Sequence, residues 1–89
     1  MLGKLELYRI FCQVAKDSSF SQAAKNLYLS QPAVSQSVKQ LEEQLGVQLF
    51  TRGAKGVSLT QQGKLLYEYA DSAMGLLSSA EQKLVSMKE

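Results

Sequence analysis

The sequence predicts a mainly α-helical chain with three helices, a two-stranded β hairpin and a final long helix. Three observations support this fold class. Apolar residues recur every three or four positions over most of the chain, which is the spacing of one helix face. The pattern changes near residues 47–60, where two short strand-like runs flank a glycine-rich loop. A seven-residue repeat then begins, and it is typical of a helix that pairs with another helix.

The composition indicates one small globular domain with an extended appendage. The chain has 89 residues, of which 45% are hydrophobic and 20% charged, and no apolar run approaches the ~18 residues of a membrane span. A single cysteine, Cys12, excludes an intrachain disulfide and fits a reducing compartment, so we expect a cytoplasmic protein with no membrane partner. The net charge of +2 divides into +4 over residues 1–64 and −2 over residues 65–89.

The first two helices are expected over residues 4–16 and 20–27. The first has apolar residues at i, i+3, i+4 and i+7, namely Leu7, Ile10, Phe11 and Val14. Ser19 and Gln22 have the spacing of a capping box, in which the serine oxygen accepts from the Gln22 amide and the glutamine side chain reaches back. The apolar face of the second helix consists of Phe20, Ala23, Ala24 and Leu27.

A third helix is expected from residue 31 to about residue 45, after a turn at residues 28–30. Ser30 can cap it, and Pro32 falls in its first turn, where a missing amide proton costs nothing. Gly46 is a natural C-terminal cap. The expected apolar row is Val34, Val38, Leu41 and Leu45, and the opposite side carries Pro32, Ser35, Gln36, Lys39 and Glu43.

Residues 47–52 and 57–60 are expected to form the two strands of a hairpin, joined by the basic, glycine-rich loop 53–56. An isolated two-stranded hairpin is marginally stable, so it would have to pack against the helices. A short capped helix, a tight turn, a proline-started helix and a hairpin follow each other in the order of a winged helix-turn-helix. We therefore expect a winged helix-turn-helix domain over residues 1–60.

The last segment, residues 61–89, is expected to be a linker and dimerisation helix capped by Thr60. At 1.5 Å per residue it would be about 40 Å long, which is more than a small globule can cover. Its apolar residues are spaced alternately by four and three, and such a seam needs a second helix. The residues of this seam are Leu66, Ala70, Ala73, Leu77, Ala80, Leu84 and Met87.

The exposed face of the third helix has side chains that can read base edges. Glutamine can pair with adenine, lysine with guanine and serine with either, while proline and alanine can touch a thymine methyl group. In the hairpin, Arg52 and Lys55 could enter the minor groove or bind phosphate. Ser21, Ser30 and Thr60 stand near helix N-termini, which favour anions, although capping alone would also explain them.

The sequence does not predict an enzyme. It has no histidine, which excludes histidine-based triads, general bases and metal ligands. A lone cysteine without histidine is a poor nucleophile, and Cys12 is better explained as a small, half-buried apolar residue. We expect no metal and no cofactor in this stretch of chain.

Two runs of residues carry a family resemblance. The first reads Ser18-Ser19-Phe20-Ser21-Gln22-Ala23-Ala24-Lys25-Asn26-Leu27 and continues with Ser30-Gln31-Pro32-Ala33-Val34-Ser35-Gln36. The second reads Leu45-Gly46-Val47-Gln48-Leu49-Phe50-Thr51-Arg52, followed by Leu59-Thr60-Gln61-Gln62-Gly63. Together they resemble the N-terminal domain of LysR-type transcriptional regulators. Ser18 replaces a common glycine of that family, and Gln36 stands where arginine is frequent.

The resemblance implies a bacterial regulator that binds double-stranded DNA at imperfect palindromes. It implies a homodimer formed by antiparallel linker helices, with a tetramer as a further assembly of a full-length protein. A small-molecule effector would bind a separate C-terminal domain, which this stretch lacks. By family position, the residues implied to face bases are Gln31, Pro32, Ala33, Ser35 and Gln36, with Lys39, Arg52 and Thr60 nearer the backbone or minor groove.

Two rival interpretations stay open at the level of sequence. The chain could be a helical protein-interaction module whose working part is the long helix, and the weak net charge does not oppose this. It could also belong to another winged-helix family with a differently built dimer. Binding to arbitrary duplex DNA at low salt separates the first rival from a DNA-binding domain, and a charge placed in the helical seam tests the second.

Overall fold

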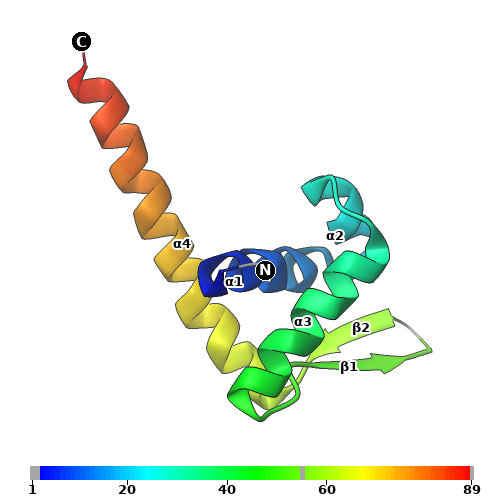
Figure 1. The fold of residues 1–89 in the computed structure, drawn as a ribbon. Helices are drawn as coiled ribbons and strands as arrows, with labels where there is room; N and C mark the ends of the chain where they lie inside the picture. The colour runs from blue at the N-terminus through cyan, green and yellow to red at the C-terminus, as the bar shows by residue number, and fades with distance from the viewer. Residues whose placement is uncertain (1–2, 55, 89) are drawn as a thin grey trace.

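The computed structural model describes residues 3–54 and 56–88, and Lys55 lies outside the described residues. The chain forms four helices and one β hairpin (Figure 1). The elements in order are α1 (Lys4–Asp17), α2 (Phe20–Leu27), α3 (Gln31–Leu45), β1 (Phe50–Gly53), β2 (Gly56–Leu59) and α4 (Gln61–Met87). This is the predicted fold class, with the helix boundaries within a residue or so of those expected.

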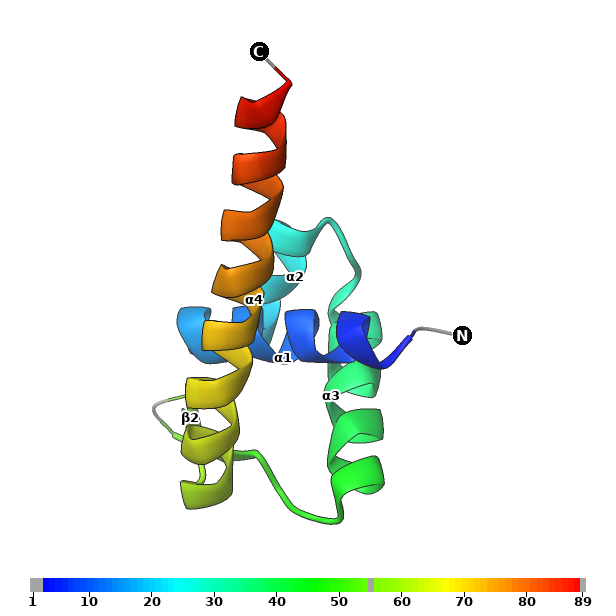
Figure 2. The ribbon, with the colours of Figure 1, turned by 90° about the vertical axis from the view of Figure 1, so that its left-hand side faces the viewer.

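Helix α1 is the centre of the core, because α2, α3 and α4 all pack against it. Figure 2 shows α4 crossing over α1, with α3 on the other side. The four apolar residues predicted to form its inner face, Leu7, Ile10, Phe11 and Val14, are all buried. The ring of Phe11 lies 5.4 Å from that of Phe50 and 6.4 Å from that of Tyr67, measured between centroids. Phe11 thus joins the hairpin and α4 to one core.

Helix α2 begins at the predicted cap but without the reciprocal half of the capping box. Ser19 Oγ accepts a hydrogen bond from the Gln22 backbone amide at 3.0 Å. The Gln22 side chain does not reach back as predicted; its Nε2 donates to Asn26 Oδ1 at 3.4 Å. Asn26 Nδ2 in turn donates to Asp17 Oδ2 at 2.9 Å. Gln22 therefore joins a polar chain that connects α2 to the end of α1.

Helix α3 has the predicted caps and most of the predicted buried row. Ser30 Oγ accepts from the Ala33 amide at 3.2 Å, and Gly46 ends the helix with a φ of 72°. Leu45, the last residue of α3, belongs to the predicted buried row but is 36% exposed. Ser37 is buried instead. It lies on the same face as Val34 and Leu41, and a serine is small enough to fit there.

The hairpin is shorter than predicted. Strands β1 and β2 pair antiparallel from Phe50 opposite Leu59 to Gly53 opposite Gly56, so the prediction of strands over 47–52 and 57–60 is wrong at the ends nearest the helices. The predicted loop 53–56 is also too long, because Gly53 and Gly56 belong to the strands. Before β1, the Leu49 amide donates to a side chain of α3, and its carbonyl accepts from the Thr60 amide at 2.9 Å. These bonds take the place of strand pairing at residues 47–49.

Helix α4 is attached to the base of the hairpin at its first turn. Thr60 Oγ1 accepts from the Gly63 amide at 2.9 Å, as a cap should, and donates to the Gln48 carbonyl at 2.7 Å. Gly63 lies so close to Leu49 that an added Cβ would stand 2.1 Å from the Leu49 carbonyl oxygen. Only glycine permits this approach. The first turn of α4 and the start of the hairpin therefore form one closely packed joint.

Beyond this joint α4 leaves the rest of the chain, as Figures 1 and 2 both show. The molecule is elongated, with principal extents of 50 × 27 × 25 Å. From Asp71 onwards no described residue of α4 is buried, and only Met74 is even half-buried. In the described part of the chain, no helix combines the length and the apolar character that a membrane crossing requires.

Candidate nucleic-acid interface

The first two turns of α3 present the predicted base-reading residues on the surface. Gln31, Pro32, Ala33 and Gln36 are exposed, and Ser35 is half-buried. The opposite face of the helix is held in the core by Val34 and Val38 and their neighbours. Core packing therefore holds one face of this N-terminal half of α3, and the opposite face is exposed to solvent.

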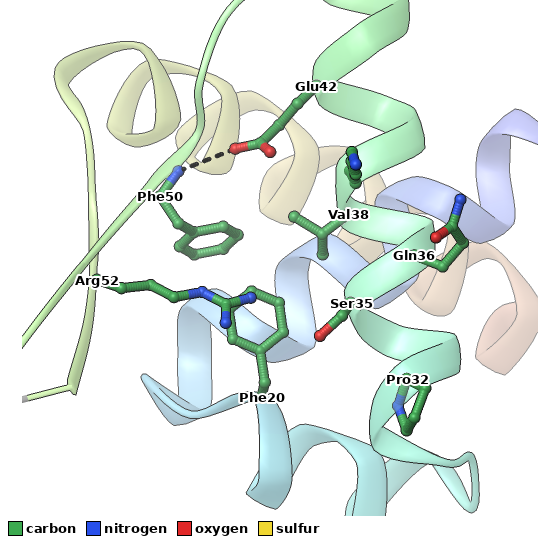
Figure 3. Close-up of a pocket in the computed structure, with 9 residues that line it drawn as sticks. Phe20, Pro32, Ser35, Gln36, Val38, Glu42, Phe50 and Arg52 are labelled. Atoms are coloured by element: carbon green, nitrogen blue, oxygen red, sulfur yellow. Dashed lines mark hydrogen bonds between the residues drawn. The ribbon is translucent and has the colours of Figure 1, made fainter.

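A groove of about 440 Å³ lies between α3 and the hairpin (Figure 3). Helix α3 forms one wall, β1 forms the other, and the ring of Phe20 lies between them. The lining residues are Phe20, Pro32, Ser35, Gln36, Val38, Lys39, Glu42, Phe50 and Arg52. Three of the five predicted base contacts thus share one groove with two of the predicted backbone contacts, Lys39 and Arg52.

Arg52 extends from β1 across the groove to the start of α2. Its guanidinium carbon lies 4.2 Å from the centroid of the Phe20 ring, which is a cation–π contact. The side chain is exposed, and no described carboxylate forms an ion pair with it. Stacking on Phe20 leaves the N–H groups at the edge of the guanidinium free for an anion. Arg52 is therefore held at the opening of the groove and keeps its charge available.

Three of the other predicted backbone contacts, Ser21, Ser30 and Thr60, do not line this groove. Ser21 is exposed on the first turn of α2, and Ser30 is exposed but its oxygen accepts from the Ala33 amide. Thr60 is half-buried, and its single hydroxyl proton is donated to the Gln48 carbonyl. Thr60 cannot donate to a phosphate in this conformation, so the structure gives it a capping role that competes with the predicted contact. The predicted contact at Lys55 falls outside the described residues.

Glu42 is the residue of the groove that the sequence interpretation missed. Its Oε2 accepts hydrogen bonds from the backbone amides of Leu49 at 2.7 Å and of Phe50 at 3.4 Å. In the sequence, Glu42 and Glu43 are adjacent on a helix, and the helical spacing places Glu43, not Glu42, on the polar face with Ser35 and Lys39. The structure differs, because Glu42 is half-buried and lines the groove, whereas Glu43 is exposed outside it. No sequence signal identifies this bond, which spans seven residues through a turn.

The predicted helical seam divides into two parts. Ala70 is only 8% exposed and Leu66 is half-buried, because this chain's own core covers them. The later residues of the seam are uncovered, with Leu77 49% and Leu84 62% exposed. Ala73 and Ala80 are exposed as well. Ala70 of the predicted seam is therefore already packed within its own chain, and dimerisation through the seam stays a prediction.

Two ionisable residues of α1, Cys12 and Glu6, have shifted pKa values and do not line the groove. Burial raises the pKa of the Cys12 thiol to about 11, and the nearby Asp71 carboxylate adds to the shift. Cys12 is therefore protonated at neutral pH and is half-buried, as predicted. Glu6 accepts hydrogen bonds from Arg9, and this contact lowers the pKa of the carboxyl.

Among residues 3–54 and 56–88, no group of three or more His, Cys, Asp or Glu side chains could hold a metal ion.

Comparison with known proteins identifies the family. A family model described as "Bacterial regulatory helix-turn-helix protein, lysR family" matches residues 5–64. The RuBisCO operon transcriptional regulator of Allochromatium vinosum is 42% identical over 84 residues, which cover 94% of this chain and 28% of the regulator. The HTH-type transcriptional regulator BudR of Klebsiella aerogenes is 42% identical over 80 residues, which cover 90% of this chain and 56% of BudR. The chain thus spans only part of these relatives.

Solved structures give the same result. The BenM DNA-binding domain in complex with catB site 1 DNA has a TM-score of 0.79 and 37% identity, covering 97% of this chain and 92% of that chain. The CbnR DNA-binding domain in its DNA complex has a TM-score of 0.82 and 28% identity, covering 98% of this chain and all of that one. The fold is that of these winged-helix DNA-binding domains. By sequence and by structure, the chain belongs to the lysR family of bacterial regulatory helix-turn-helix proteins.

Proposed function

We propose that this chain is the DNA-binding domain of a LysR-type transcriptional regulator and binds double-stranded DNA in a sequence-specific manner. The observation that carries the proposal is the groove between α3 and β1 (Figure 3). One wall carries polar side chains able to read bases, and Arg52 stands on the other wall with its charge unpaired among the described residues. The complexes of BenM and CbnR with DNA support it.

In this proposal the N-terminal half of α3 enters the major groove. Gln31 and Gln36 are exposed there and can each form two hydrogen bonds with an adenine edge. Ser35 can donate or accept, while Pro32 and Ala33 offer apolar contact to a thymine methyl group. These five residues are our candidates for direct base contact.

The DNA backbone would run along the groove beside α3. Lys39 lines it, and Arg52 at its opening can bind a phosphate or enter the minor groove. Ser21 and Ser30 add hydroxyl groups near the N-termini of α2 and α3, where the helix dipole favours anions. Lys55 and Thr60 complete the set of candidates, with Thr60 requiring a change in its hydrogen bonding. The charge of +4 over residues 1–64 would attract the duplex.

A homodimer would form through the exposed part of α4. In the family arrangement two such helices pair antiparallel, and here Ala73, Leu77, Ala80 and Leu84 are the uncovered seam, with Leu66 and Ala70 at its base. The domain then divides into a DNA-binding part at residues 1–60 and a dimerisation helix at 61–89. Two recognition helices about 34 Å apart would enter successive major grooves of an imperfect palindrome. Effector binding and a tetramer would belong to a longer protein, acting at the DNA in the bacterial cytoplasm.

Selection from a randomised duplex library tests the proposal. We expect a palindromic motif to be enriched. Gln31→Ala and Gln36→Ala should each relax the base preference at one position, at a cost of roughly 1–3 kcal/mol on the preferred site. Arg52→Ala should weaken binding evenly across sequences and lower the salt dependence, with a slope smaller by about 0.9 per lost phosphate contact.

Gln44→Ala is the matched control, because Gln44 is exposed on the same helix and does not line the groove. It should leave the selected motif unchanged. If the selection enriches no motif, the proposal that binding is sequence-specific is wrong. If no arbitrary duplex is bound even at low salt, the exposed α4 would favour a protein-interaction module instead.

A further inference from the structure

We infer that Glu42 is a positioning residue for DNA binding: its carboxylate holds the start of the hairpin against α3 and thereby sets where Arg52 meets the phosphate backbone. The inference rests on the proposed function, since it concerns the same groove. It assigns to an acidic side chain in a DNA-binding groove a favourable effect on binding.

The bond joins the two walls of the groove. Glu42 projects from the fourth turn of α3, and its Oε2 accepts from the Leu49 amide at 2.7 Å and from the Phe50 amide at 3.4 Å. Figure 3 shows the bond to Phe50. The side chains of Leu49 and Phe50 are both buried in the core, so the backbone at these two residues is also held by core packing. A charged acceptor makes a stronger hydrogen bond than a neutral one. The carboxylate therefore fastens the first residue of β1 to the helix that would read the bases.

Arg52 is fixed in turn through Phe50. The two residues lie on the same strand, and both are paired with β2, Phe50 with Leu59 and Arg52 with Val57. Their side chains also meet through a third residue, because the Phe20 ring lies 5.8 Å from the Phe50 ring and 4.2 Å from the Arg52 guanidinium carbon. A shift of Phe50 would carry Arg52 with it. The position of the guanidinium thus depends on the Glu42 bonds.

The charge of Glu42 supplies an independent argument. A carboxylate that lines a groove for DNA repels phosphate, so electrostatics alone predicts tighter binding when it is removed. Glu43 has the same charge, is one residue away and lies exposed outside the groove. If charge alone mattered, Ala at either position would tighten binding. If Glu42 positions Arg52, the two substitutions act in opposite directions.

Fluorescence anisotropy with an arbitrary duplex of about 20 base pairs, titrated over a range of salt concentrations, measures this difference. Glu43→Ala should bind about twofold tighter through the loss of one negative charge. Glu42→Ala should bind about tenfold weaker, with a salt slope smaller by about 0.9, as for Arg52→Ala. Glu42→Gln keeps an oxygen that can accept both amide bonds, so it should recover most of the affinity and the slope.

A double-mutant cycle distinguishes positioning from general destabilisation. Glu42→Ala combined with Arg52→Ala should bind no more weakly than Arg52→Ala alone, because the first change acts through the second residue. Hydrogen exchange of the Leu49 and Phe50 amides should be faster in Glu42→Ala and near wild type in Glu42→Gln. If Glu42→Ala does not fold, Glu42→Met replaces it, since methionine keeps the length and helix preference but offers no carboxylate.

The inference is overturned if Glu42→Ala binds as tightly as wild type or tighter, or if its loss of affinity adds fully to that of Arg52→Ala. Either result would leave DNA binding by the wild-type chain intact, and the proposed function would stand. If neither wild type nor Glu43→Ala binds duplex DNA at low salt, the proposed function fails and the role of Glu42 fails with it.

Discussion

The two ends of α4 follow the same heptad repeat and meet different surroundings. At the first end Leu66 and Ala70 pack against α1 in the core of their own chain. At the other end Leu77 and Leu84 have about half or more of their surface exposed. A heptad repeat therefore identifies the apolar side of a helix but not what covers it. Here the chain's own core covers the apolar side of the first three turns, and in the proposed dimer a second copy would cover the rest.

Charge follows the same division. Residues 1–64, which hold the groove, carry a net +4, whereas residues 65–89, which form most of α4, carry a net −2. The packed region is thus suited to phosphate, and the projecting helix is not. This contrast supports separate roles for the two regions, with DNA binding in the first and self-association in the second.

Removal of a core ring from the packed region should have the largest effect on stability. Phe11→Ala deletes a fully buried ring that touches Phe50 and Tyr67, so the free energy of unfolding should fall by about 3–5 kcal/mol. Urea denaturation followed by circular dichroism measures it. Leu84→Ala, made in a monomeric background such as Leu77→Glu, should change it little. Equal losses at both positions would contradict the division of α4.

A charge in the uncovered seam should break the dimer and spare the fold. Leu77→Glu would bury two carboxylates in the proposed interface, so the dissociation constant of the dimer should rise by about 100-fold or more. Sedimentation equilibrium measures the change. Ser79→Glu introduces the same charge on an exposed part of α4 off the seam and is the matched control. A dimer that tolerates Leu77→Glu would require a different interface.

Replacement of either of two glycines of α4 by alanine should change the stability of the fold, in opposite directions at the two positions. Gly63→Ala would place a Cβ 2.1 Å from the Leu49 carbonyl oxygen, so it should lower stability by about 1–3 kcal/mol. Gly75→Ala meets nothing within 4 Å and should raise stability by up to about 1 kcal/mol through its helix preference. Thermal unfolding of the two variants measures both. A stabilising effect of Gly63→Ala would show that the joint between α4 and the hairpin is not closely packed.

The smallest effect is expected at the boundary between the two regions, where Cys12 of α1 lies near Asp71 of α4. The pKa of the thiol is raised in the folded chain to about 11 from its ordinary 9.0. Its stabilising contribution is therefore complete below pH 9 and is lost as the pH rises from 9 to 11. Alkylation by iodoacetamide at pH 8 should be slower in the native chain than in urea. Asp71→Asn should make the native thiol slightly more reactive, and no change would exclude the charge effect.

Much of the fold could be predicted because local signals agree along this chain. Ser19, Ser30 and Thr60 each cap the helix that they precede, and the spacing of apolar residues located the core of α1. The strand prediction failed at residues 47–49 for a tertiary reason. Their alternation is typical of a strand, but Glu42 and Thr60 supply their hydrogen-bond partners instead.

The candidate site was predictable in its residue types and not in its connections. The position of Arg52 after a strand-like run indicated a phosphate or groove contact, whereas its stacking on Phe20 depends on how α2 and β1 pack. Residue type did not distinguish Glu42 from Glu43, and the helical spacing favoured Glu43 as the residue on the polar face, whereas Glu42 lines the groove. The burial of Ala70 within its own chain could not be predicted either, because the sequence does not show which part of the seam packs against α1.

The contact of Gly63 with the Leu49 carbonyl has a consequence for the geometry of target DNA. Because it fixes the tilt of α4 at its root, it makes the helix a stiff lever arm of about 40 Å. A change in tilt of about 5° would move the far end by roughly 3.5 Å, close to the rise of one base pair. In the proposed dimer, small side chains at this root would set the phase of the two half-sites along the duplex.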